Sequence, residues 1–142
     1  MVGIAVLGAG RIGKIHAANV AASKFAKLVV VADPFGDAAQ SLADAFGADA
    51  MLDCEAAIDR DDVQAIVIGT PTHTHISLML RAVRQGKAVL CEKPIDLDMA
   101  KSLAAVEEVE RLNGRVMLAF NRRFESTFAE MCAAIDSGDI GE

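Results

Sequence analysis

The sequence predicts a doubly wound α/β fold, with a parallel sheet of strand order 3-2-1-4-5-6, and three observations support it. Short apolar runs alternate along the chain with stretches of helical periodicity. The runs are continuously apolar, which is typical of parallel strands that are covered on both faces. The links between them are short, so we expect right-handed crossovers.

The elements follow from composition and punctuation. The expected strands are rich in β-branched or small apolar residues, and they are Val2–Leu7, Leu28–Ala32, Asp49–Leu52, Val63–Ile68, Lys87–Cys91 and Arg115–Phe120. The expected helices carry apolar residues at helical spacing, and they are Arg11–Ala22, Asp37–Phe46, the turn Glu55–Ile58, Ile76–Gln85, Asp98–Leu112 and Glu125–Ser137. Gly86 and the pair Asn113-Gly114 stand where two of these helices are expected to end.

The composition excludes several classes of protein. At 142 residues the chain has the usual length of one domain, and 53% apolar residues are too many for a disordered chain. No run of about 18 apolar residues occurs, so no membrane span is expected. The net charge of −6 and the lack of Trp and Tyr argue against a nucleic acid partner. Cys54, Cys91 and Cys132 form no Cys-x-x-Cys pair, so we expect a cytoplasmic protein with reduced cysteines and no structural metal.

A glycine-rich turn directly follows the first expected strand and begins the first expected helix. It reads Gly8-Ala9-Gly10-Arg11-Ile12-Gly13, the G-x-G-x-x-G pattern of dinucleotide-binding folds of the Rossmann type. Gly8 permits the tight turn, Gly10 lets the backbone approach a pyrophosphate, and Gly13 lets the helix pack close to the strand. The N–H groups that begin the helix then face the phosphates. The predicted cofactor-binding residues are Gly8, Gly10, Arg11, Ile12 and Gly13, and an ordinary turn between a strand and a helix is the alternative.

Asp33 ends the second expected strand, 20 residues after Gly13. An acidic residue at this place accepts hydrogen bonds from the adenosine ribose hydroxyls and repels a 2′-phosphate. The next residues, Pro34-Phe35-Gly36, supply no Arg or Lys that could bind such a phosphate. The sequence therefore favours NAD over NADP as the cofactor. A solvated turn aspartate before a proline is the structural alternative.

Two further motifs follow the fourth and fifth expected strands. They are Gly69-Thr70-Pro71-Thr72-His73-Thr74-His75 and Cys91-Glu92-Lys93-Pro94. Together with the glycine-rich turn and His16, they resemble the glucose–fructose oxidoreductase, inositol dehydrogenase and rhizopine catabolism family of NAD(P)-dependent oxidoreductases. The resemblance runs along the whole chain, and the Glu-Lys-Pro triplet is its most specific mark. Within the family, Glu92–Asp98 and Phe120–Phe124 are most similar to bacterial inositol 2-dehydrogenases.

Both motifs lie where parallel strands end, at the edge of the sheet where such folds bind ligands. Thr70 and Pro71 are expected to line the loop under the nicotinamide half of the cofactor, and His75 either contacts the cofactor or has a structural role. The resemblance implies that Lys93 contacts the substrate alcohol and helps to move its proton; a lysine there also stabilises alkoxide charge. Glu92 is expected to orient Lys93 or to face the cofactor carboxamide. A surface lysine in a turn is the alternative for Lys93.

The stretch after the last expected strand reaches the same edge. In inositol dehydrogenases the positions of Asn121 and Arg122 face the substrate pocket, so the resemblance implies that these side chains bind hydroxyl groups of a polyol or sugar. A cationic helix start is the alternative. We expect His16 to pack within the first helix and His73 to be exposed, and no cluster of His and carboxylates indicates a catalytic metal.

The resemblance implies hydride transfer from a ring carbinol carbon to NAD, and for an inositol 2-dehydrogenase the conversion of myo-inositol to a 2-keto-inositol. In the family, an Asp and a His of a second domain act with the lysine, and no histidine follows Lys93 in this sequence. We therefore interpret residues 1–120 as a dinucleotide-binding domain and residues 121–142 as a connecting segment and helix, with the substrate domain absent.

This interpretation has two further consequences, and it leaves two alternatives open. The chain alone is expected to be inactive, and the full-length form is implied to be a homo-oligomer. A dehydrogenase of the same family that acts on another sugar or polyol is one alternative. A free-standing NAD-binding module without catalysis is the other.

Overall fold

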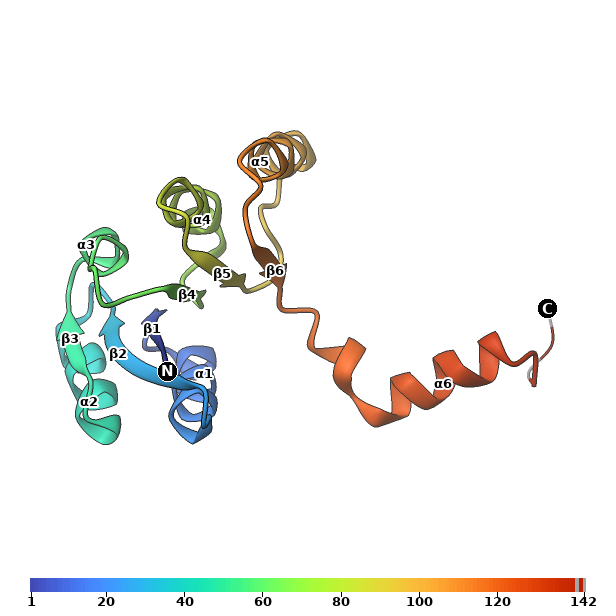
Figure 1. The fold of residues 1–142 in the computed structure, drawn as a ribbon, viewed down its shortest axis with the longest axis horizontal. Coiled ribbons are helices and arrows are strands. Elements are labelled where there is room, and N and C mark those ends of the chain that lie inside the picture. Colours follow the sequence, from blue (N-terminus) through green and yellow to red (C-terminus); the bar gives the residue numbers. More distant parts are fainter. Residues whose placement is uncertain (140, 142) are drawn as a thin grey trace.

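The computed structural model, which describes residues 1–139 and residue 141, confirms the predicted fold class (Figure 1). Its strands are β1 (Val2–Leu7), β2 (Ala26–Ala32), β3 (Asp49–Met51), β4 (Ala65–Ile68), β5 (Ala88–Cys91) and β6 (Val116–Leu118). They form one six-stranded sheet of order β3-β2-β1-β4-β5-β6, and every neighbouring pair is parallel. Residues 140 and 142, which belong to the predicted connecting segment, lie outside the described residues.

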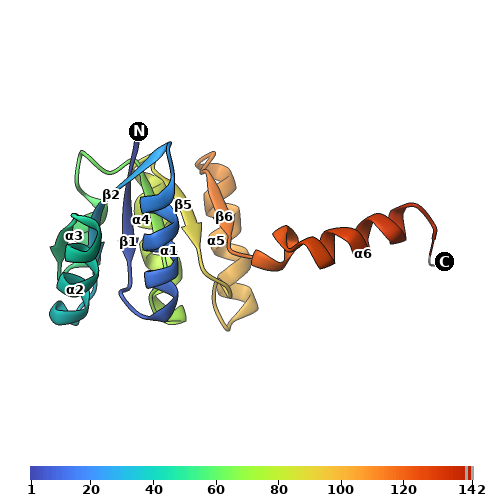
Figure 2. The same ribbon diagram turned by 90° about the horizontal axis from the view of Figure 1, so that it is seen from below.

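Helices cover the two faces of the sheet unequally. The helices are α1 (Arg11–Ala22), α2 (Gly36–Phe46), α3 (Cys54–Ile58), α4 (His75–Arg84), α5 (Met99–Arg111) and α6 (Ser126–Asp136), with short 3₁₀ turns η1 (Thr72–Thr74) and η2 (Asn121–Phe124). Figure 1 shows α1 and α2 on one face and α3, α4 and α5 on the other. The last helix, α6, projects away from the sheet beyond β6 (Figure 2).

Five of the six strands differ from their predicted bounds by one or two residues at an end, and hydrogen bonds explain two of these differences. The strand predicted from Val63 begins at Ala65, because Gln64 uses its side-chain oxygen to accept a hydrogen bond from the Gly3 N–H at 2.7 Å. The strand predicted to reach Phe120 ends at Leu118, because the Phe120 N–H turns back to the Leu118 carbonyl at 2.8 Å. The chain then enters η2.

The continuous apolar runs are explained by a core on each face of the sheet. In β1, Ala5 and Leu7 pack into the cluster under α3, α4 and α5, whereas Val6 packs into the cluster under α1 and α2. All three side chains are fully buried. A strand that is buried on both faces has no position for a polar side chain, so its sequence shows no alternation.

The contact of α1 with the sheet depends on glycine at two positions. A Cβ on Gly13 would lie 1.8 Å from the Gly8 carbonyl oxygen, so α1 could not approach β1 as it does with any other residue there. Gly8 itself has φ +95°, and a Cβ on it would lie 2.6 Å from the Gly69 carbonyl oxygen at the end of β4. The turn, the helix and two strands therefore meet with backbone against backbone.

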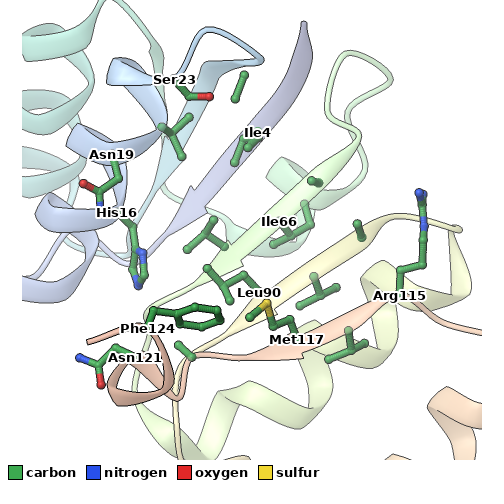
Figure 3. Close-up of a pocket in the computed structure, with 18 residues that line it drawn as sticks. Ile4, His16, Asn19, Ser23, Ile66, Leu90, Arg115, Met117, Asn121 and Phe124 are labelled. Atoms are coloured by element: carbon green, nitrogen blue, oxygen red, sulfur yellow. The ribbon is translucent and has the colours of Figure 1, made fainter. Parts of the chain in front are cut away.

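The face of β4, β5 and β6 on the α1 side carries an apolar groove of about 740 Å³ (Figure 3). Its floor includes Ile66, Leu90 and Met117, and Phe124 and Asn121 lie at one end.

The apolar side chains of α6 are also exposed, with Met131 and Ile135 about half accessible. Among the residues that the structure describes, no helix has both the length and the apolar character that a membrane span requires.

The glycine contact gives the first testable prediction. We expect Gly13→Ala to lower the free energy of unfolding by about 2–3 kcal/mol, because the added methyl group forces α1 away from β1. Urea unfolding followed by circular dichroism measures this change. The matched control is Gly10→Ala: a Cβ there meets no atom within 4 Å, and the cost should be about 0.5 kcal/mol, the difference between Gly and Ala at an N-cap. Equal stabilities of the two variants would contradict the inference that α1 needs glycine at position 13 to pack against β1.

Candidate functional site

The predicted site residues gather along the edge of the sheet where the strands end. The glycine-rich turn follows β1, Thr70 and Pro71 follow β4, Glu92 and Lys93 follow β5, and Asn121 and Arg122 follow β6. Because β1, β4, β5 and β6 are consecutive parallel neighbours, these four segments lie side by side at one edge, at the bottom of the sheet in Figure 2. Ligands of doubly wound sheets bind at this edge.

The three glycines of the turn serve different purposes. Gly8 and Gly13 are required by backbone packing, but a Cβ on Gly10 would meet nothing within 4 Å. Gly10 is also the N-cap of α1, where no side chain bonds to the free N–H groups of the first helical turn. Uncapped N–H groups behind an open approach are suited to a phosphate group. The packing thus leaves space where a pyrophosphate would need it.

The carboxylate of Asp33 is fixed beside this turn. Its Oδ2 accepts a hydrogen bond from the Ala9 N–H at 2.7 Å, and its Oδ1 accepts one from the Phe35 N–H at 2.8 Å. The bond to Phe35 is the turn role considered as the alternative, and the bond to Ala9 ties the end of β2 to the glycine-rich turn. Each carboxylate oxygen has further lone-pair capacity, so this structural role is compatible with the predicted bond to a ribose.

His75 is buried, with 2% of its surface accessible, and its ring joins two of the site segments. Nδ1 lies 2.8 Å from the Pro94 carbonyl oxygen and Nε2 lies 2.9 Å from the Thr70 carbonyl oxygen. A neutral ring donates from one of these nitrogens at a time. This placement favours the structural alternative for His75 over a direct contact with a cofactor, because both ring nitrogens already face protein carbonyls.

The loop after β4 is held by its own hydroxyl groups. Thr70 Oγ1 lies 2.7 Å from Thr74 Oγ1, and the Thr74 hydroxyl donates to the Pro71 carbonyl at 2.8 Å. Thr70 is partly buried and Pro71 is exposed. The predicted pair therefore stands on a braced loop between the glycine-rich turn and β5.

Glu92 has a partner that sequence reasoning missed. Its Oε1 lies 2.9 Å from Nε2 of His16 on α1, and each side chain is 16% exposed. His16 was expected only to pack within the helix. One available signal was its position beside the buried stripe of Gly13, Ala17 and Val20, which places it at the margin of the helix face that meets the sheet.

Lys93 and Asn121 lie beside a shallow pocket of about 410 Å³ at the same edge. Its lining comprises Lys93, Ala119, Phe120, Asn121, Arg122 and Arg123. The Arg122 guanidinium donates to Glu125 at 3.3 Å and lies 5.2 Å from the centre of the Phe128 ring. The structure therefore brings Lys93 and Asn121 together, whereas Arg122 is also engaged with α6.

Two cysteines near the site have properties of buried thiols. Burial of the thiol, and to a smaller extent the charge of Asp33, raise the pKa of Cys54 to about 11. Burial and the charge of Glu92 raise the pKa of Cys91 to about 12. Both thiols are therefore protonated at neutral pH, and neither is an activated nucleophile. Within residues 1–139 and 141, no group of three His, Cys, Asp or Glu side chains could hold a metal ion.

This strand order and a glycine-rich turn at the first crossover define a dinucleotide-binding fold of the Rossmann class. The family model GFO_IDH_MocA, which describes an oxidoreductase family with an NAD-binding Rossmann fold, matches residues 2–120. The chain therefore belongs to this family.

Individual relatives support the assignment. The chain is 46% identical over 137 residues to inositol 2-dehydrogenase of Rhizobium meliloti (strain 1021), a match that covers 96% of this chain and 41% of the relative. A solved myo-inositol dehydrogenase from Corynebacterium glutamicum ATCC 13032 is 48% identical, with a TM-score of 0.91 and coverage of 100% and 43%. Scyllo-inositol dehydrogenase from Lactobacillus casei, solved with NAD(H) and scyllo-inositol, is 28% identical, with a TM-score of 0.95 and coverage of 100% and 43%. The chain thus spans about two fifths of the length of the relatives it matches.

The structural role of His75 can be tested by stability. We expect His75→Leu to lower the free energy of unfolding by about 1–3 kcal/mol, because the carbonyl groups of Thr70 and Pro94 lose the hydrogen bonds that the buried ring makes with them. The matched control is His73→Leu on the exposed side of η1, which should change stability by less than about 0.5 kcal/mol. Chemical denaturation of the two variants measures the difference, and a wild-type stability for His75→Leu would refute the role.

Proposed function

We propose that this chain is the NAD-binding part of an oxidoreductase that oxidises a ring CH–OH group of a polyol, with myo-inositol as the substrate. The observation that carries the proposal is the pocket shared by Lys93 and Asn121, on the same edge of the sheet as the glycine-rich turn. The names of the R. meliloti and C. glutamicum relatives support inositol as the polyol. A module that only bound a nucleotide would have no need of substrate-side groups at this edge.

The residues at the edge fit an NAD molecule. Open space at Gly10 and the uncapped start of α1 suit the pyrophosphate, and Asp33 supplies the acceptor for the adenosine ribose. From there the nicotinamide half would extend across β4 to β5, past Thr70 and Pro71 to Glu92. When bound, NAD supplies the acceptor for the hydride that leaves the carbinol carbon.

Lys93 is proposed to act on the substrate oxygen. Its side chain is exposed at the pocket, and the preceding residue, Glu92, is still held by its backbone bond to Ile68 at the end of β4, so the ammonium group can reach a ligand from a fixed strand end. The ammonium group donates a hydrogen bond to the reacting hydroxyl and stabilises the negative charge that develops as the hydroxyl proton passes to a base of the substrate-binding part. Asn121 can both donate to and accept from the other ring hydroxyls, and Arg122 can only donate to them.

The other parts of the proposal concern the whole protein. We propose that residues 1–120 form the dinucleotide-binding unit and that residues 121–142 connect it to a substrate-binding part, as the greater length of the relatives suggests. We further propose a cytoplasmic homo-oligomer. Scyllo-inositol is the second candidate substrate, because the L. casei structure that binds it has a TM-score of 0.95 to this chain.

The role of Asp33 predicts the cofactor preference. We expect Asp33→Ala to weaken NAD binding about tenfold or more, through loss of a charge-assisted hydrogen bond, and to narrow the difference between NAD and NADP. Titration calorimetry of the chain with each cofactor measures both effects. The control is Asp44→Ala, which removes the same charge at the far end of α2 and should leave both affinities unchanged. Unchanged affinities for Asp33→Ala would remove it from the cofactor site.

The substrate can be tested with a chimera. We expect this chain, fused to the remaining part of the R. meliloti inositol 2-dehydrogenase, to form NADH from NAD and myo-inositol, whereas the 142-residue chain alone forms none. Lys93→Met should reduce turnover by the chimera about 100-fold or more, and the exposed Lys101→Met should not.

Two outcomes of this assay count against the proposal. Inositol-dependent turnover by the chain alone would show that no second part is required. A folded chimera that binds NADH but oxidises neither myo-inositol nor scyllo-inositol would contradict the proposed substrates.

A further inference from the structure

We propose that His16 is a positioning residue: it holds the carboxylate of Glu92 towards the nicotinamide half of the bound dinucleotide. This inference rests on the proposed function, because it presumes that NAD binds along the edge described above. It assigns a role in that site to a histidine of the helix that carries the glycine-rich turn.

Hydrogen bonds hold both the backbone and the carboxylate of Glu92. Its backbone N–H donates to the Ile68 carbonyl at 2.9 Å, so the residue continues the pairing of β5 with β4. Its Oε1 meets Nε2 of His16 at 2.9 Å. Figure 3 shows the His16 ring pointing from α1 towards the strands, at the end of the groove where Asn121 and Phe124 lie. The pair thus bridges the glycine-turn helix and the strand that precedes Lys93.

The chemistry of the pair points to a ligand that donates hydrogen bonds. A carboxylate only accepts, and one of its oxygens is engaged by His16, so Oε2 is the atom available for a ligand. The nicotinamide half of the cofactor carries such donors in its ribose hydroxyls and its carboxamide NH₂. The adenine half is served by Asp33, which lies on the other side of β1 from β4 and β5.

Packing of α1 does not require this hydrogen bond between His16 and Glu92. The helix is seated by the contact of Gly13 with Gly8 and by the buried Ala17 and Val20. Taking a histidine and a carboxylate to 16% exposure costs desolvation, so a pair with no ligand role would be a poor source of stability. Because the pair lies at the edge where the cofactor would bind, the desolvation cost is explained if the hydrogen bond holds the carboxylate in one orientation before the cofactor binds.

The test separates the two halves of the cofactor by comparing NADH with ADP, which lacks the nicotinamide nucleotide. We expect His16→Ala to weaken NADH binding about tenfold and to leave ADP binding within about twofold. His16→Gln should restore most of the NADH affinity, because its amide N–H can donate to Glu92 in place of the imidazole. In a Glu92→Ala background, His16→Ala should have no further effect on NADH, since the residue it positions is gone. Exposed His73→Ala is the matched control and should bind both ligands as the wild type does.

Three outcomes would overturn the inference. Equal weakening of NADH and ADP by His16→Ala, without rescue by His16→Gln, would mean that α1 is distorted. Full NADH affinity in His16→Ala, or in Glu92→Ala should His16→Ala not fold, would mean that the pair positions nothing for the cofactor. A wild-type chain that binds neither NADH nor ADP would overturn the proposed function as well. If the wild-type chain binds both ligands, the proposed function stands, and the variants test the role of His16 alone.

Discussion

The close approach of α1 to β1 and β4 is the constraint on which the rest of the structure depends. Backbone meets backbone at Gly8, Gly13 and Gly69, and backbone hydrogen bonds join Gly8 to Ala32 and Gly69 to Leu7 at the ends of three neighbouring strands. This contact places the first turn of α1 at the edge of the sheet where the strands end. The orientation of the first helical turn, the bond from Ala9 to Asp33 and the reach of His16 to Glu92 all follow from it.

The site is built from short segments that are cross-braced by side chains to the backbone. Asp33 ties the end of β2 to the glycine-rich turn, and His75 ties the loop after β4 to the segment after Lys93. Such bonds fix loops that would otherwise move, and they do so with buried or half-buried groups. Lys93 itself is exposed and lies between these braced segments.

The glycine-rich turn could be predicted from adjacent residues, and the sheet order from the alternation of continuous apolar strands with helices along the chain, because that pattern is typical of the doubly wound fold. The continuous apolar strands indicated burial on two faces, and the spacing of Gly8 and Gly13 indicated the tight turn from β1 into α1. The pairing of His16 with Glu92 spans 76 residues and depends on how α1 crosses the sheet, so no local pattern specified it.

Two other site residues show a related limit. His75 begins α4, one residue before the predicted helix start, but whether its ring faced a ligand or the carbonyl groups of Thr70 and Pro94 depended on the fold of the Lys93 segment. Arg122 was placed at the correct edge, yet its contacts with Glu125 and Phe128 were not foreseen. A histidine or an arginine can bind several kinds of partner. Which partner it binds depends on where another segment of the chain passes, and residue type alone does not determine that.

The exposed helix α6 has a consequence for the motions of the chain. It has 11 residues and none of them is buried, whereas an isolated helix shorter than about 12–15 residues is only marginally stable in water. Its helical state therefore depends on what packs against Met131 and Ile135. In the absence of such contacts, its amide hydrogens would exchange with solvent almost as fast as those of an unfolded peptide, while those of β1 would exchange only when the whole sheet opens.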